Sequence, residues 1–271
     1  MPELPEVETL RRGLAPHVLG QRIARVIVRD RRLRWPVPAG MENRLTGCLI
    51  QGISRRGKYL LVDCTSGCLL LHLGMSGSLR IVLPNTPAGK HDHVDIVLAR
   101  GATIRFTDPR RFGAVLWAGS KPETHALLVG LGREPLEADF TGQWLYNATR
   151  GGRVALKLWL MDARRVAGIG NIYANEALFR AGIRPTRAAG RIARETSVRL
   201  VEAIKEILQR AIKAGGSTLR DFVGADGQPG YFQQEYFVYG RGGEPCRVCR
   251  TPIRLIRQSG RASYYCPICQ R

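Results

Sequence analysis

No hydrophobic run in this 271-residue chain approaches the roughly 18 apolar residues that would suggest a membrane-spanning helix. A secretory signal is also lacking, because residues 1–6 are acidic where such a signal begins with positive charge. Internal repeats and low-complexity tracts are absent as well. With 44% apolar residues, we therefore expect a globular, cytoplasmic protein that has no membrane partner.

Acidic residues are scarce, since 22 Asp and Glu stand against 42 Lys and Arg, and the formal net charge is +20. An excess of this size favours a polyanionic partner, because neutralising phosphates releases condensed counterions and supplies most nonspecific affinity for DNA. The alternative is that the arginines are merely solvated. The balance of charge favours a nucleic-acid partner.

Cysteines are few, and their positions divide them into two sets. Three lie scattered among apolar residues and are interpreted as buried thiols: Cys48, Cys64 and Cys68. The other four form two pairs, with two residues inside each pair and sixteen between the pairs: Cys246, Cys249, Cys266 and Cys269. Two thiolate pairs on tight turns suit one structural Zn²⁺ with no open coordination position, and two disulfides are the alternative. Basic and aromatic residues between the pairs favour a DNA-contacting finger.

The period of the hydrophobic pattern changes along the chain. Apolar residues at helical spacing predict an N-terminal helix over residues 6–19. From about residue 23 to residue 117, short apolar runs separated by Gly, Pro and Asn predict an antiparallel sandwich or barrel, with strands at 25–28, 59–62, 68–71, 78–82, 94–98 and 103–106. After Pro135 the pattern predicts helices at 156–161, 171–180 and 192–213.

The N-terminus offers a nucleophile. Pro2 follows a methionine that aminopeptidases are expected to remove, and an α-amino group titrates near 7.7–8.0, so much of it is neutral where a lysine is protonated. Attack on a sugar C1′ would give an iminium that acts as an electron sink, and Glu3 and Glu6 would supply carboxylates for proton transfer. The alternative is an ordinary helix start, with proline in the first turn and acids favoured by the helix dipole.

Seven motifs, in order along the whole chain, resemble the formamidopyrimidine-DNA glycosylase family. They are residues 2–9, 58–61, 72–77, 90–95, 107–113 and 168–173, followed by the four-cysteine finger. The resemblance implies an α+β fold in which an antiparallel β-sandwich with a flanking N-terminal helix is followed by a helical lobe containing a helix-two-turn-helix and by a zinc finger. It divides the chain into a catalytic domain (1–132), a helix-two-turn-helix domain (133–223), a lesion-recognition loop and linker (224–240) and the finger (241–271), with DNA between the lobes.

The resemblance also implies a chemistry: a base-excision-repair glycosylase that removes oxidised purines from duplex DNA and cleaves the strand by β,δ-elimination. Pro2 would be the nucleophile that forms a Schiff base, and Glu3 the general acid. Lys58 matches the proton donor and phosphate ligand for β-elimination, although a solvated lysine after two arginines is the alternative. Arg261 matches the finger arginine that serves δ-elimination and phosphate binding.

The same resemblance implies a set of DNA contacts. Met75, Arg110 and Phe112 would fill the space left by an extruded nucleotide, with Arg110 facing the opposite cytosine, although Met75 and Phe112 could also be core residues. Asn171, at an expected helix start, would bind a phosphate. Further contacts are expected at His72, His91, Arg153 and Lys157. The loop at 224–232 would close over the extruded base.

Two other functions remain open. An endonuclease VIII-like glycosylase that prefers oxidised pyrimidines would share Pro2, Glu3, the lysine and the finger, although residues 4–8 and the Met75, Arg110 and Phe112 trio favour the purine enzyme. A zinc-ribbon DNA-binding protein without catalysis would leave the N-terminal run and Lys58 unexplained. From the family we expect a bacterial monomer.

Overall fold

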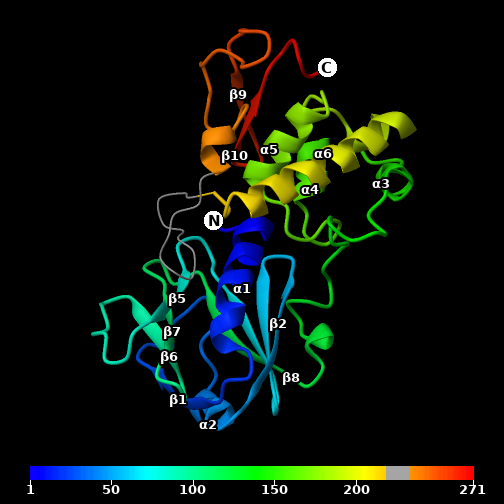
Figure 1. Cartoon of the computed structure of the whole chain (residues 1–271). Coiled ribbons are helices and arrows are strands. Elements are labelled where there is room, and N and C mark those ends of the chain that lie inside the picture. The colour runs from blue at the N-terminus through cyan, green and yellow to red at the C-terminus, as the bar shows by residue number, and fades with distance from the viewer. Residues whose placement is uncertain (218–231) are drawn as a thin grey trace. The chain divides into compact units, whose positions relative to one another are not determined.

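The computed structural model describes residues 1–217 and 232–271, which fall into two compact units. The first unit comprises Met1–Gly130 together with residues 214–217, and the second comprises Leu131–Lys213 together with Phe232–Arg271. Figure 1 labels the elements of both units along the chain. None of the helices in the described ranges combines the length and apolar character that a membrane span requires.

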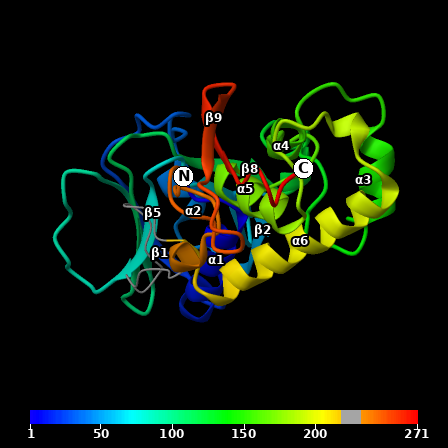
Figure 2. The ribbon, with the colours of Figure 1, turned by 90° about the horizontal axis from the view of Figure 1, so that it is seen from above.

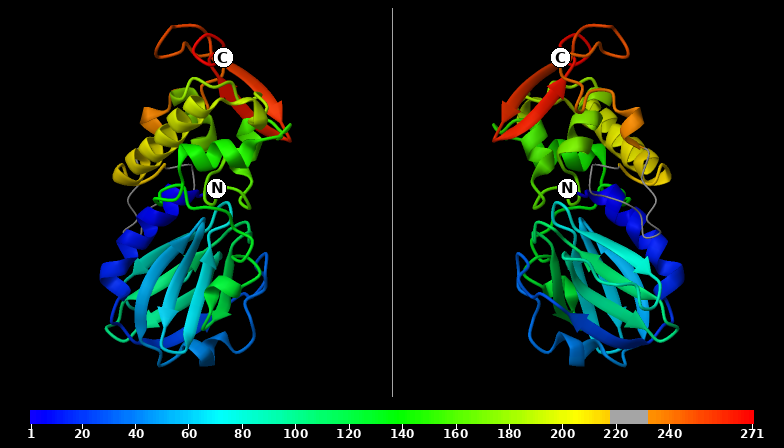
Figure 3. Two further views of the ribbon diagram at one scale, coloured as in Figure 1. Left: turned by 90° about the vertical axis from the view of Figure 1, so that its right-hand side faces the viewer. Right: turned by 90° about the vertical axis from the view of Figure 1, so that its left-hand side faces the viewer.

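The first unit is built on two four-stranded antiparallel sheets, ordered β1-β6-β7-β5 and β2-β3-β4-β8. The strands are β1 Ile23–Val28, β2 Ile50–Arg56, β3 Tyr59–Cys64, β4 Gly67–His72, β5 Ser78–Val82, β6 Asp92–Leu98, β7 Thr103–Thr107 and β8 Ala114–Gly119. Side chains from both sheets, such as Ile96 and Phe106 from one and Leu69 and Val115 from the other, share one buried core. The predicted β-sandwich is therefore confirmed, and Figure 3 shows its two layers.

The N-terminal helix α1 (Leu4–Val18) lies against the sandwich because its apolar stripe joins that core. Val7, Leu10, Leu14 and Val18 are each at most 1% exposed. Helix α1 contacts β2, β3 and β5, and the short helix α2 (Met41–Leu45) contacts β1. The three cysteines of this unit are buried free thiols, as predicted: Cys48, Cys64 and Cys68.

The second unit joins four helices to the cysteine-containing segment. The helices are α3 Gly142–Thr149, α4 Leu156–Met161, α5 Asn171–Arg180 and α6 Arg194–Lys213. The described residues add three short 3₁₀ helices at Pro122–Thr124, Ala189–Arg191 and Phe232–Glu235, the first of them in the first unit. Helix α6 packs against α3 and α5, an arrangement visible in Figure 2, and buries the apolar stripe that predicted it.

The C-terminal hairpin, β9 (Arg254–Gln258) with β10 (Arg261–Tyr265), belongs to the same compact unit as these helices. Its packing against α5 includes a hydrogen bond from the Tyr264 amide to Asn175 Oδ1 at 2.8 Å. The four-part domain division expected from the sequence stays a prediction. The expected closing loop at 224–232 lies outside the described residues except for Phe232.

Candidate functional site

The first turn of α1 fixes the predicted nucleophile and acid. Pro2 and Glu3 are buried at the helix start, and the Glu3 amide donates to Glu6 Oε2 at 2.8 Å, which forms part of a capping box. The other carboxylate oxygen of Glu6 accepts from the Ser217 amide at 2.8 Å. Glu6 is 2% exposed, and backbone amides donate to both of its carboxyl oxygens. The buried Glu6 carboxylate therefore fixes the backbone directly after Pro2.

Lys58 lies in the two-residue turn between β2 and β3, directly before Tyr59, which pairs with His72 on β4. The His72 ring lies 4.8 Å from the Tyr59 ring, and its Nδ1 accepts from the Gly74 amide at 3.1 Å. Burial, together with the positive charges of Lys58 and Arg34, lowers the pKa of His72 to about 4. At neutral pH, His72 is therefore an uncharged imidazole whose remaining nitrogen, Nε2, carries the proton.

Met75, Arg110 and Phe112, the residues predicted to fill the space of an extruded nucleotide, lie on two neighbouring turns. These predicted wedge residues are exposed at the surface. Met75 is 40% exposed and Phe112 is 41% exposed, which favours the predicted wedge role over a place in the core. The Arg110 guanidinium carbon lies 5.0 Å from the Phe112 ring centroid. Gly74 has a φ of +61°, and a Cβ there would lie 2.4 Å from the Phe112 carbonyl carbon. The two turns therefore pack backbone to backbone, which only glycine permits.

Asp108, which the sequence analysis did not single out, joins these two turns through hydrogen bonds. Its side chain is fully buried; Oδ1 accepts from the Ser76 hydroxyl and Oδ2 from the Gly113 amide, each at 2.8 Å. Its backbone amide donates to the His91 carbonyl at 3.0 Å, and its carbonyl lies 2.8 Å from His93 Nε2. One residue thus links the segments that carry four of the eight predicted DNA contacts, Met75, His91, Arg110 and Phe112. The sequence did carry one signal that could have identified Asp108, namely an acidic residue inside a strongly basic segment.

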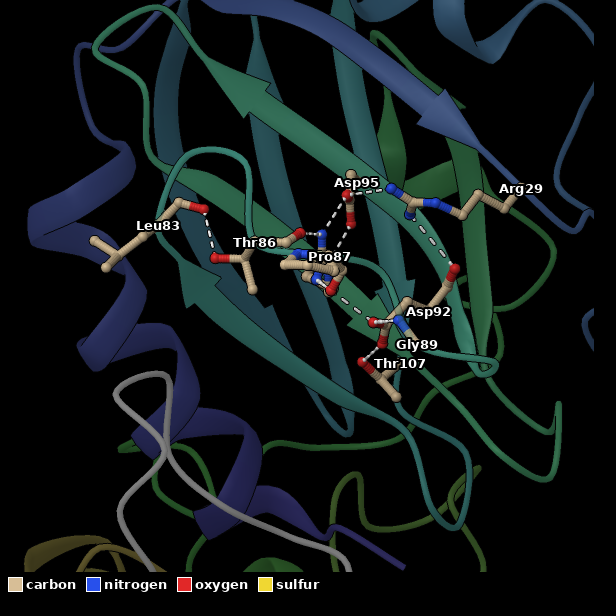
Figure 4. Close-up of polar contacts among 9 residues, drawn as sticks. Arg29, Leu83, Thr86, Pro87, Gly89, Asp92, Asp95 and Thr107 are labelled. Carbon is tan, nitrogen blue, oxygen red and sulfur yellow. Dashed lines mark hydrogen bonds and ion pairs between the residues drawn. The ribbon is translucent and has the colours of Figure 1, made fainter.

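A second buried network anchors the loop that leads to His91 (Figure 4). Arg105 binds Asp95 through two hydrogen bonds of 2.9 Å each, and donates to the carbonyls of Thr86 and Pro87, also at 2.9 Å. Arg29 adds an ion pair to Asp95 at 2.6 Å. Burial would raise the pKa of Asp95, but the hydrogen bonds from Arg105 and Arg29 outweigh it and lower that pKa. The loop before His91 is therefore tied to the sheet by charged groups.

In the second unit, one predicted contact begins a helix and another lies in the segment before a helix. Asn171 opens α5 after Gly170, which has extended backbone, and the Asn175 side-chain amide donates to the Asn171 carbonyl at 2.6 Å. Arg153 is exposed in the segment before α4. Asn175, to which the sequence assigned no role, also binds β10 and so joins α5 to the hairpin.

Lys157 differs from its predicted role as a direct DNA contact. Its side chain is fully buried in α4, and Nζ donates to the Ala262 carbonyl at 2.6 Å and to Ser263 Oγ at 2.7 Å. The Ser263 hydroxyl in turn donates to Gln258 Oε1 at 2.7 Å across the hairpin. Arg261, at the tip of that hairpin, is exposed. Lys157 therefore acts on the strand that carries Arg261, because its ammonium is enclosed by protein acceptors.

The four clustered cysteines bring their sulfurs within 4.8 Å of one another, including one Sγ pair at 3.9 Å and one at 3.3 Å. A tetrahedron of Zn–S bonds of about 2.3 Å requires sulfurs about 3.8 Å apart, so the set fits zinc. In each pair the turn donates an amide to its first sulfur at 3.4 Å: Val248 to Cys246, and Cys269 to Cys266. All four positions are filled by protein, which indicates a structural metal.

Family models match three successive parts of the chain. The N-terminal domain of formamidopyrimidine-DNA glycosylase matches residues 1–115, and the H2TH domain of that enzyme matches residues 131–223. A zinc finger found in FPG and IleRS matches residues 243–271. With the cysteine cluster, this match confirms the predicted site for one structural Zn²⁺, and the three matches together confirm the predicted fold class.

Curated relatives and solved structures cover the full chain. A formamidopyrimidine-DNA glycosylase of Stutzerimonas stutzeri is 59% identical over 271 residues, which is 100% of both chains. A crystal structure of a mutant of the Lactococcus lactis enzyme with DNA containing Fapy-dG matches with a TM-score of 0.92 and 35% identity over 100% of both chains. A complex of the Lactococcus lactis enzyme with DNA containing an abasic site matches with a TM-score of 0.92 and 36% identity over 99% of both chains.

Proposed function

The chain belongs to the formamidopyrimidine-DNA glycosylase family, and from this membership we propose that it is a bifunctional DNA glycosylase and AP lyase of base excision repair. Its substrate is duplex DNA that contains oxidised purines, namely 8-oxoguanine and formamidopyrimidines. The observation that carries the proposal is the first turn of α1, where Glu3, directly after the buried Pro2, is held by the buried Glu6 carboxylate. The full-length match to relatives of that name supports the same assignment.

Catalysis starts at the nitrogen of Pro2 once Met1 has been removed. That nitrogen attacks C1′ of the damaged nucleotide, the bond from C1′ to the base breaks, and the base leaves with the proton released by the nitrogen. The bond from C1′ to O4′ then opens, with Glu3 as the general acid that protonates O4′, and an iminium forms between Pro2 and C1′. The iminium accepts electrons when a C2′ proton is lost, and the 3′ phosphate then leaves in β-elimination. Loss of the 5′ phosphate completes δ-elimination. Water then hydrolyses the Schiff base and returns the free amine.

Two cations serve the elimination steps and the phosphates. Lys58, in the turn next to the uncharged His72, supplies a proton and binds phosphate during β-elimination. Arg261, exposed at the finger tip, binds phosphate during δ-elimination. Lys157 is a positioning residue that holds the Arg261 strand. The zinc site supports this role, since the four thiolates of Cys246, Cys249, Cys266 and Cys269 hold the two turns from which the hairpin extends.

DNA recognition requires the damaged nucleotide to leave the stack. Met75, Arg110 and Phe112 fill the vacated space, and Arg110 donates hydrogen bonds to the cytosine opposite the lesion. Phosphates are bound by further contacts at His72, His91, Arg153 and Asn171. We propose that the protein works as a monomer in the bacterial cytoplasm, a setting supported by the bacterial origin of its relatives.

The test is covalent trapping. Purified protein, with Met1 shown to be absent by intact mass, is incubated with a duplex carrying 8-oxoguanine opposite cytosine, and borohydride is added. We expect an adduct that peptide mapping assigns to Pro2, and an adduct with oxidised pyrimidines that forms more slowly. Binding of the duplex without any adduct would support a binding protein instead, and faster trapping on oxidised pyrimidines would support the endonuclease VIII-like specificity.

A further inference from the structure

The second unit carries an open depression of about 580 Å³ that none of the predicted site residues lines. Four arginines and two tryptophans form it: Arg133, Arg150, Arg164, Arg165, Trp144 and Trp159. The other lining positions are three glycines and Ala148, and no acidic side chain is among the lining residues, all of which the structure describes. The depression is therefore cationic, with an aromatic floor and little side-chain bulk at its rim.

Two of the arginines are held in place by the tryptophans. The Arg133 guanidinium carbon lies 5.0 Å from the Trp144 ring centroid, and that of Arg165 lies 5.3 Å from Trp159. The two indole rings lie 6.1 Å apart. Acids outside the lining hold the same guanidinium groups, since Arg133 pairs with Asp139 at 3.1 Å and Arg165 reaches Asp162 at 3.4 Å. Less side-chain entropy is lost when a ligand binds groups that are already fixed.

Arg150 is fixed by backbone carbonyls and an aromatic ring. Its Nε donates to the Tyr146 carbonyl at 2.9 Å and its Nη2 to the Ile192 carbonyl at 2.7 Å, and the guanidinium carbon lies 4.0 Å from the Tyr146 ring centroid. Arg164 also lines the depression and is 81% exposed while pairing with Asp162. The four guanidinium groups carry four positive charges, and the carboxylates that pair with them, Asp139 and Asp162, carry two negative charges. The cluster therefore retains positive charge.

The chemistry that fits this surface is a phosphodiester. Guanidinium groups form forked hydrogen bonds to phosphate oxygens, and their planar faces and the aromatic floor accept the sugar and base that accompany the phosphate. Gly151 lies at the rim, where a Cβ would meet no atom within 4 Å, so a strand can approach the backbone closely. Gly152 is followed directly by Arg153, a predicted DNA contact.

We propose that this depression is a second phosphate-binding site for a DNA strand, separate from the residues that act on the lesion. The inference rests on the proposed function in one respect, the choice of DNA as the polymer. The strand is either the flank of the lesion duplex or a separate segment, and both present the same phosphodiester. A free phosphate shares part of this chemistry but would leave the aromatic floor unused.

The test places one negative charge in the depression. Ala148 is exposed on α3 and lines the depression, so Ala148→Glu opposes a phosphate there, while Ala148→Gln has nearly the same size and no charge. Gln143→Glu adds an equal charge at an exposed α3 position outside the lining. Neither position belongs to the catalytic machinery.

Each protein is first trapped with borohydride on a short lesion duplex, and a labelled undamaged single strand is then titrated onto the trapped complex by anisotropy. In parallel, the salt dependence of binding is measured on lesion duplexes of increasing length. We expect Ala148→Glu to weaken binding of the added strand, or of the longer duplex, about tenfold and to lower the salt slope by about 0.7–0.9 for each lost phosphate contact. Wild type, Ala148→Gln and Gln143→Glu should behave alike.

The trapping step separates this inference from the proposed function. If wild type forms no adduct, the enzymatic assignment fails, and the depression is tested by the same titration on the untrapped protein. Equal behaviour of Ala148→Glu and Ala148→Gln in both assays would overturn the second site. The assignment to DNA would be overturned if inorganic phosphate bound in the depression while Ala148→Glu changed the binding of neither the single strand nor the long duplex.

Discussion

The carboxylate of Glu6 accepts a hydrogen bond from the backbone amide of Ser217 at 2.8 Å, although the two residues lie 211 positions apart in the sequence. The other oxygen of the same carboxylate holds the Glu3 amide at 2.8 Å. Gly216, with a φ of +80°, lets the chain pass close enough, because a Cβ there would lie 3.3 Å from the Glu6 side chain. The first turn of α1 and the segment at 214–217 are therefore joined by one buried group.

Glu6→Gln should slow covalent trapping by about tenfold or more while leaving duplex affinity nearly unchanged. The glutamine retains one acceptor oxygen, but its NH₂ group faces a second amide donor, and an unsatisfied buried amide costs about 1–3 kcal/mol. Single-turnover trapping and anisotropy measure the two effects separately. Glu123→Gln, an exposed change of the same chemistry, is the control. A Glu6→Gln protein that traps at the rate of this control would contradict a positioning role for the carboxylate.

Lys157→Met should lower the melting temperature and reduce the δ-elimination product, because it removes the ammonium that binds Ala262 and Ser263. The loss of these charge-assisted bonds should cost about 1.5–3 kcal/mol. Arg153→Met, at an exposed position, should instead weaken DNA binding and reduce its salt slope without changing the melting temperature. Differential scanning calorimetry and product gels distinguish the two. If Lys157→Met behaves like Arg153→Met, the lysine contacts DNA after all.

Removal of zinc should unfold the finger. The four sulfurs lie within 4.8 Å of one another, and metal binding to this set supplies folding free energy that is lost when the metal is removed. We expect one zinc per chain by elemental analysis, and a strong chelator should lower the melting temperature and abolish DNA binding through Arg261. Cys249→Ser should bind less zinc and reproduce both effects. A chelated protein that keeps its melting temperature would exclude a structural role for the metal.

Local signals in the sequence predicted most of the fold. Helices α4 and α5 coincide with the predicted ranges 156–161 and 171–180, which were predicted because both ranges lack proline. Strand β2 was not singled out, since Gly52 and the polar residues around it interrupt the apolar pattern of Ile50 and Ile53. Helix α3 was also missed, although Thr141 caps it by accepting from the Trp144 amide. Tertiary packing decides both elements.

The candidate site was predicted less completely, because motifs locate residues but do not give their partners. The motifs placed Met75 and Arg110 on exposed turns, yet Asp108, which joins those turns, bonds to a residue 32 positions away. Lys157 was expected at the surface, where lysines usually lie, and its buried acceptors are more than 100 positions distant. Such long-range pairs have no local signature in a single sequence.

Asp108→Asn should impair base extrusion more than chain cleavage. The new NH₂ group would oppose a backbone amide in either orientation, that of Gly113 or that of Arg110, which loosens the turns that carry the predicted wedge residues. We expect excision of 8-oxoguanine to slow about tenfold or more, while a preformed abasic site, from which no base is removed, is cleaved at nearly the normal rate. Glu123→Gln, an exposed carboxylate-to-amide change, is the control. Equal losses on both substrates would point to general misfolding instead.

The uncharged state of His72 gives the protein a defined response to acid. Burial, with the charges of Lys58 and Arg34, lowers the folded pKa of His72 to about 4, whereas an unfolded histidine titrates near 6.5. Between these values the unfolded chain binds more protons, so the contribution of His72 to stability is present above about pH 6.5 and is lost as the pH falls towards 4. Denaturant unfolding at pH 7.5 and pH 5 should show a larger loss for wild type than for His72→Gln, which does not titrate. An NMR titration of the imidazole should show no inflection between pH 5 and pH 8, and a midpoint near 6.5 would mean that the ring is solvated and free to bind phosphate as a cation.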